Sequence, residues 1–190
     1  MSDAVPVQLA EYSTMRAEIC AFHGVEGQVV SVSVTLITAL LGALTWALGN
    51  GSFKIGDDAT FIHLVPLPFL ALGLVFAYTQ VRIIQAASYV QKHLRPRIAA
   101  AVGIGHDDVL MWEIFRRDRA DCPVKALATA LNSVRWLFFI LPAMFPLTAW
   151  QRDLKSVGDF LLVIWDLTTL VVLIYLAIWT SIRLPHRVID

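Results

Sequence analysis

The sequence has little of what a secreted or a charged, soluble protein needs. Cysteine occurs only twice in 190 residues, at Cys20 and Cys122. Both fall in segments that we place in the cytosol, where disulfides are rare, so no disulfide is expected. Charged residues make up 16% of the chain, and 15 basic residues balance 15 acidic ones. This zero net charge gives no support for nucleic-acid binding.

Motifs for catalysis are also missing. The chain has no Cys-x-x-Cys pair, no Gly-x-Ser-x-Gly, no Walker-type loop and no His-Glu-x-x-His. The run His106-Asp107-Asp108 contains metal-ligand types, but adjacent residues point in different directions on a helix. Capping of a helix explains it better. We therefore expect no enzyme, no metal site and no cofactor.

Long apolar runs are what the chain has in abundance. Hydrophobic residues make up 57% of it, and no Asp, Glu, Lys or Arg occurs from Gly27 to Phe53 or from Ala59 to Val81. About 20 apolar residues cross the hydrocarbon of a bilayer as a helix. Both runs are longer than that, so we interpret them as retained spans and not as buried core helices.

The pattern predicts an all-α integral membrane bundle of four transmembrane helices. Spans 1 and 2 are expected near 29–48 and 61–81, and span 4 near 160–182. The segments are an amphipathic N-terminal helix (1–27), a transmembrane hairpin (28–81), a basic helical cytosolic segment (82–126), a second transmembrane hairpin (127–182) and a cytosolic tail (183–190).

Several boundaries follow from local signals. Pro66 and Pro68 predict a kink or a late start for span 2, and Pro96 should end the helix that extends it. The uncharged run of span 3 is short, so that helix must begin near Leu127 with Arg135 snorkelling to the interface. Trp136 and Trp150 would then lie at opposite interfaces as an aromatic belt.

Basic residues predict the orientation. With the N-terminus inside, the cytosolic segments hold 12 Lys and Arg residues and the external loops hold 3. An excess of Lys and Arg marks the cytosolic side of a membrane protein. We therefore expect both termini in the cytosol and the protein in the inner membrane.

Asp166 is the first candidate site, because a carboxylate inside a span is costly and should face protein or water. Thr169 shares its helical face, and His63 near the outer end of span 2 is the nearest cationic partner. The three residues predict either a polar ring or ion path, or a protonated Asp166 that fixes helix packing. The sequence leaves both alternatives open.

Span 1 carries a stripe of small and hydroxylated residues at alternating spacings of three and four. Its members are Ser31, Thr35, Thr38, Gly42 and Thr45. Such a row lets another helix approach closely and offers hydrogen bonds across the contact. It is typical of helix packing, within one chain or between copies, and a narrow pore is the other interpretation.

A basic set lies in the cytosolic segment. Its members are Lys92, Arg95, Arg97, Arg116 and Arg117. These cations could hold anionic lipid head groups or a partner protein. The alternative is that they are the excess of Lys and Arg that cytosolic loops ordinarily carry.

Two stretches carry a resemblance to known proteins. Glu11-Tyr12-Ser13-Thr14-Met15-Arg16-Ala17-Glu18-Ile19 precedes span 1, and Tyr89-Val90, Leu94-Arg95-Pro96 and Trp112-Glu113 lie in the cytosolic segment. They resemble a loose group of small bacterial multi-pass proteins. Some four-span proteins of this appearance accompany anti-phage systems as membrane sensors or effectors, and the resemblance implies such a role.

Two functions fit these observations. The first is a homo-oligomeric channel-like or membrane-perturbing sensor or effector, in which Asp166 contributes to an ion path. The second is a non-conducting scaffold that recruits a cytosolic protein partner through its N-terminal helix and basic loop. Both have the lipid bilayer as a partner, and neither involves nucleic acid.

Overall fold

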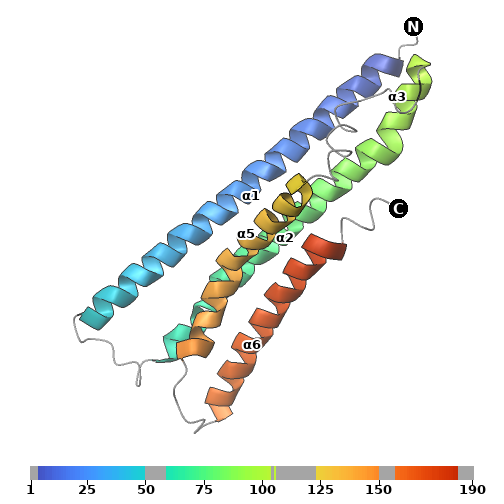
Figure 1. Ribbon diagram of the computed structural model, residues 1–190. Coiled ribbons are helices and arrows are strands. Elements are labelled where there is room, and N and C mark those ends of the chain that lie inside the picture. The colour runs from blue at the N-terminus through green and yellow to red at the C-terminus, as the bar shows by residue number, and fades with distance from the viewer. Residues whose placement is uncertain (1–3, 50–58, 104, 106–122, 150–156, 184–190) are drawn as a thin grey trace. The chain divides into compact units, whose positions relative to one another are not determined.

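The computed structural model describes residues 4–49, 59–103, 105, 123–149 and 157–183, and the regular structure in them is helical (Figure 1). Its α-helices are α1 (Ala4–Gly49), α2 (Pro66–Tyr89), α3 (Arg95–Val102), α5 (Pro123–Ala149) and α6 (Val157–Ile178). A 3-10 helix (Ala59–Leu64) precedes α2, and π-helical turns cover Val90–Leu94 and Trp179–Arg183. The predicted all-α class is confirmed.

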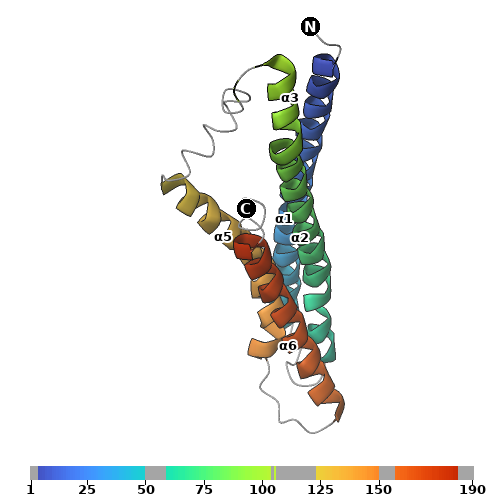
Figure 2. The ribbon, with the colours of Figure 1, turned by 90° about the vertical axis from the view of Figure 1, so that its right-hand side faces the viewer.

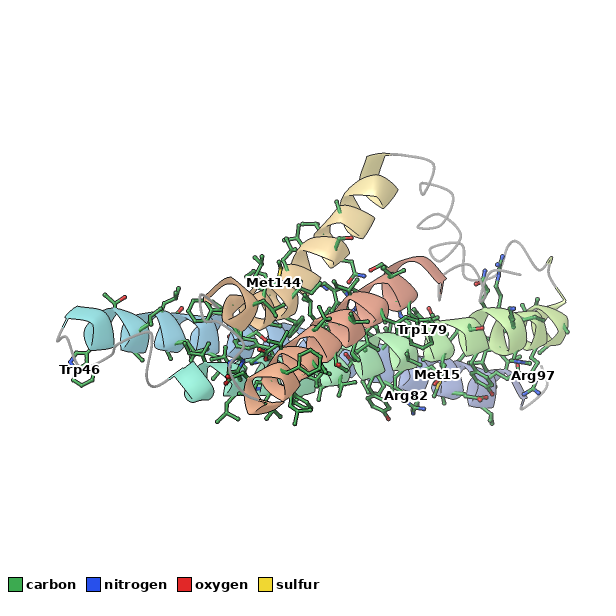
Figure 3. All side chains as sticks on the ribbon, turned by 90° about the horizontal axis from the view of Figure 1, so that it is seen from below. Met15, Trp46, Arg82, Arg97, Met144 and Trp179 are labelled. Atoms are coloured by element: carbon green, nitrogen blue, oxygen red, sulfur yellow. The ribbon has the colours of Figure 1, made fainter. Side chains whose placement is uncertain are left out.

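Four described stretches are long and apolar enough to cross a membrane. They are Val5–Trp46, Ile62–Val102, Ala130–Leu147 and Gly158–Ser181. Side chains on their surfaces are largely apolar, and Trp46 projects from the end of α1 with 69% of its surface exposed (Figure 3). Apolar side chains that face outward in this number fit a bilayer and not water. The chain has the length and composition of a multi-pass membrane protein.

The predicted N-terminal helix and span 1 are one uninterrupted helix. α1 has 46 residues, which is about 69 Å at 1.5 Å per residue. The hydrocarbon core of a bilayer is only about 30 Å thick. The helix therefore extends far beyond any span that it forms.

The prolines in α2 and α3 act differently from one another. α2 begins at Pro66, directly after the 3-10 helix, so the late start predicted for span 2 is confirmed. The prediction that Pro96 ends the helix is wrong, because α3 includes Pro96 near its first turn. A π-turn precedes it, in which the N–H of Arg95 donates to the carbonyl of Val90, five residues back. This wider turn leaves room for the proline ring.

Gly103 ends this long helical stretch instead. Its φ of 74° is left-handed, and its N–H donates to the carbonyl of Ala99 at 2.9 Å. Glycine adopts this conformation without the steric penalty of a Cβ, so it is the usual residue after a helix.

The chain divides into two compact units. The first contains the described parts of residues 1–26, 78–132 and 180–190, and the second those of residues 27–77 and 133–179. In the first unit, the N-terminal half of α1 lies beside the end of α2 and α3 (Figures 1 and 2). In the second unit, α2, α5 and α6 enclose an apolar core that includes Phe69, Phe139 and Leu173.

Candidate functional site

A buried pair of ionisable side chains lies in the second unit. The 3-10 helix before α2 positions His63, and α6 positions Asp166. Nδ1 of His63 lies 2.5 Å from Oδ2 of Asp166, so the two side chains are in hydrogen-bonding contact. His63 is 7% exposed and Asp166 is 0% exposed. The structure thus joins two predicted site residues that are 103 positions apart in sequence.

Thr169 completes the predicted polar set on α6. It lies one helical turn after Asp166 and is buried, with 2% of its surface exposed. Its neighbour Thr168 is exposed and donates its hydroxyl to the carbonyl of Ile164 at 2.7 Å. Of the two adjacent threonines, Thr169 is therefore the one that is enclosed together with Asp166.

The two oxygens of Asp166 are in different situations. Oδ2 accepts from His63, whereas Oδ1 is buried and has no hydrogen-bond partner among the described residues. A buried carboxylate oxygen without a donor costs more than a neutral unpaired group.

An aromatic cluster fills the same core farther along the helices. The ring centroids of Phe76 and Trp136 are 5.3 Å apart with the planes at 87°, and Trp136 and Phe139 are 5.7 Å apart. Edge-to-face contacts at these distances are favourable beyond their burial of area. We call Phe76, Trp136 and Phe139 the aromatic cluster.

Trp136 does not serve the aromatic belt that the sequence suggested. Only 1% of its surface is exposed, so the prediction that it lies at an interface is wrong. The physical reason is the small residue opposite it: Gly73 on α2 lets the Trp136 ring and Leu173 of α6 approach closely. Trp150 lies outside the described residues.

The stripe on α1 faces outward in the single chain. Ser31, Thr35, Thr38, Gly42 and Thr45 are all exposed, whereas Ser33 on the other face of the helix is fully buried. Thr35, Thr38 and Thr45 donate their hydroxyls to carbonyls four residues back at 2.8–3.0 Å. Their hydrogen-bonding needs are met within the helix, so this surface is compatible with lipid as well as with a second helix.

The first unit contains a row of polar contacts that the sequence analysis missed. The hydroxyl of Tyr89 donates to Glu11 at 2.6 Å, and the guanidinium of Arg82 lies 3.3 Å from Glu18. The next contact joins Gln80 to Glu26. We call these three contacts the polar ladder. From contact to contact the residue numbers increase along α1 and decrease along α2, so the two helices are antiparallel here.

The polar ladder had a signal in the sequence. Glu11 and Glu18 are seven residues apart and Glu26 follows after eight, so the three carboxylates lie on one side of a helix. Glu26 is 2% exposed and also contacts Nδ1 of His23 at 3.1 Å. The missing information was the partner, because a single helix pattern does not identify the helix that pairs with it.

The predicted basic set divides into three parts. Lys92 and Arg97 are exposed, and Arg97 lies toward the far end of the helix pair from Arg82 (Figure 3). Arg95 is only 7% exposed, on the face that also buries Leu94 and Ile98. Arg116 and Arg117 lie outside the described residues.

No group of three or more His, Cys, Asp or Glu side chains that could hold a metal ion occurs in the described part of the chain. Comparison with known proteins adds no relative: no protein-family model, curated protein or solved structure matches this chain.

Proposed function

We propose that this protein is a homo-oligomeric membrane protein of the bacterial inner membrane that acts as a channel-like or membrane-perturbing sensor or effector. The buried contact between His63 and Asp166 is the observation that carries this proposal. Ionisable groups inside membrane spans are rare and mark ion or proton pathways by default.

A purely structural role explains the pair poorly. A buried ion pair is usually no more stable than apolar residues of similar volume, because desolvation offsets the attraction between the charges. The core of the second unit already has tight apolar packing around Phe69, Phe139 and Leu173. Apolar residues at these two positions would therefore have been sufficient for stability alone.

Assembly from several copies is supported by the exposed stripe on α1. Small residues at positions such as Gly42 allow two helix backbones to approach closely. The stripe is exposed in one chain, so another copy has access to it. We expect the stripes of neighbouring copies to form the contacts of the oligomer.

We propose that the aromatic cluster keeps the ion path closed. Phe76, Trp136 and Phe139 are buried in the core of the second unit. We expect an ion that passes through this core to need the cluster to open. The polar ladder connects α1 to the extension of α2.

Ion flux into vesicles tests the proposal. The full chain is reconstituted in vesicles of phosphatidylethanolamine and phosphatidylglycerol, and flux is compared for wild type, Asp166→Asn and the matched surface change Asp159→Asn. We expect Asp166→Asn to lower flux at least about 10-fold, which corresponds to 1.4 kcal/mol, and Asp159→Asn to retain it. Equal flux for wild type and Asp166→Asn, with assembly intact, would remove Asp166 from the mechanism.

A scaffold is the second candidate, and the exposure of Lys92 and Arg97 favours it. These cations lie on the extension of α2, where a cytosolic partner could bind them. Because Arg95 is buried, charge reversal there would disturb the fold, so the test uses Lys92→Glu with Arg97→Glu. Loss of partner capture by this variant together with normal capture by Asp166→Asn would favour the scaffold. Capture unaffected by the reversal would count against it.

The cellular setting rests on two arguments from the sequence. The excess of Lys and Arg in the predicted inner segments supports a cytosolic position for both termini. The resemblance of the segment from Glu11 to Ile19 to small bacterial multi-pass proteins suggests a role in anti-phage defence.

A further inference from the structure

Asp166 offers few atoms to a ligand. Oδ2 is occupied by His63, and Oδ1 is the buried oxygen without a partner among the described residues. Thr169 is the nearest additional polar side chain on the same face of α6. A ligand of this site therefore meets one carboxylate oxygen and at most one hydroxyl from α6.

This donor set does not suit a metal ion. Calcium takes six to eight oxygen ligands, and magnesium requires six in near-ideal octahedral geometry. The described residues contain no group of three His, Cys, Asp or Glu side chains, and His63 already directs Nδ1 at the carboxylate. Among the described residues, a metal ion that loses its water at this site would find too few oxygen ligands to replace it.

Other ionisable groups are scarce around the pair. In the described part of the second unit, the remaining ionisable side chains are Arg135 on α5 and Asp159 and Tyr175 on α6. The described residues of α1 in this unit, 27–49, contain none. Tyr175 is 58% exposed, and Asp159 lies in the first turn of α6. Apart from His63 and Asp166, none of these described ionisable side chains is buried.

We infer that the species bound and exchanged at Oδ1 of Asp166 is a proton and not a metal ion. This inference rests on the proposed function, because it identifies the cation of the same site. A proton needs only one oxygen lone pair, and it converts the buried charge at Oδ1 into a neutral hydroxyl group. That change removes the most costly feature of the buried site.

The exchange is the uptake and release of one proton. Before uptake, Asp166 is a carboxylate whose Oδ2 lies beside Nδ1 of His63. A proton from water binds Oδ1 and forms a carboxylic acid, and the reverse step returns that proton to water. The charge of the pair rises by one on uptake and falls by one on release, so the population of the acid depends on pH. His63 is the member that keeps some exposure, with 8% of its side chain accessible.

Infrared difference spectroscopy of the full chain in vesicles reports the protonated carboxyl group directly. Spectra of wild type, Asp166→Asn and Asp159→Asn are recorded between about pH 4 and about pH 9, a range that spans the ordinary titration of Asp and His. We expect a carboxylic-acid C=O band that depends on pH, is lost in Asp166→Asn and is retained in Asp159→Asn. At fixed pH, replacing choline by sodium, potassium or calcium should leave this band unchanged.

Two results would overturn the inference. One is a band that weakens when a metal ion is added at fixed pH, because the metal would then be displacing the proton. The other is the absence of any carboxylic-acid band that Asp166→Asn removes. A titrating band together with no flux in the vesicle assay would instead contradict conduction and leave the proton site standing. Flux of sodium or potassium together with a band that responds to these ions would support conduction and contradict the proton site.

Discussion

The contact between His63 and Asp166 affects the stability of the apolar core in which both side chains are buried. Each residue alone would be costly to bury in the core of the second unit, and their contact at 2.5 Å lowers that cost. Removal of one partner from a buried pair costs about 3–5 kcal/mol, because the other charge is left without compensation. Replacement of both by apolar residues of similar volume is often neutral.

A double substitution separates stability from function at this site. We expect His63→Leu to lower the stability of the purified protein by about 3 kcal/mol, and the pair His63→Leu with Asp166→Val to recover most of that loss. Thermal unfolding in detergent measures both. The recovered double variant should still lack flux in vesicles. Normal flux in it would show that the pair is structural.

At the scale of helices, the contact between α2 and α6 depends on Gly73. A Cβ on Gly73 would lie 2.6 Å from Cδ2 of Leu173 and 3.6 Å from the ring of Trp136. Leu173 is fully buried, so it has little freedom to move away. Overpacking of a filled core typically costs about 1–3 kcal/mol.

Gly73→Ala should therefore destabilise the second unit by about 1–3 kcal/mol. The matched control is Gly27→Ala on α1, where an added Cβ meets nothing within 4 Å. There alanine should stabilise the helix by up to about 1 kcal/mol. Unfolding temperatures that change in the same direction for both variants would contradict the close approach at Gly73.

The polar ladder is a second feature at this scale, and it makes the N-terminal half of α1 a partner of α2. Tyr89→Phe removes the hydroxyl that donates to Glu11. We expect a loss of about 1 kcal/mol, and thus about fivefold faster amide hydrogen exchange in α1 around Glu11. Tyr78→Phe is the control, because Tyr78 is 60% exposed. Unchanged exchange in the Tyr89 variant would mean that this contact does not hold α1.

The elements differ in how far the sequence predicts them. Uncharged runs located the spans, because lipid penalises charge on every exposed face, and Asp166 stood out for the same reason. The aromatic cluster and the polar ladder could not be predicted, since each depends on which helices meet. On the extension of α2, Ala86, Val90 and Leu94 are buried, whereas Ala87 is exposed. A π-turn changes the helical register at Val90, and no residue pattern announced it.

At the scale of the whole molecule, the exposed stripe predicts self-association. Gly42→Leu places a large side chain in the stripe, so it should shift the particle in detergent toward the mass of a single chain. Ala43→Leu, at the next exposed position of α1, should leave the mass unchanged. Light scattering combined with size-exclusion chromatography measures both. A wild-type particle that is already a monomer would contradict assembly through this face.

Labelling of single cysteines in intact cells tests the central claim that four segments cross the membrane with both ends in the cytosol. With other cysteines replaced, Lys54→Cys and Lys155→Cys should react with a maleimide that cannot cross the membrane. Native Cys20 and Arg187→Cys should react only after the membrane is opened. Reaction of Cys20 or of Arg187→Cys in intact cells, or protection of Lys54→Cys, would contradict the four-span arrangement.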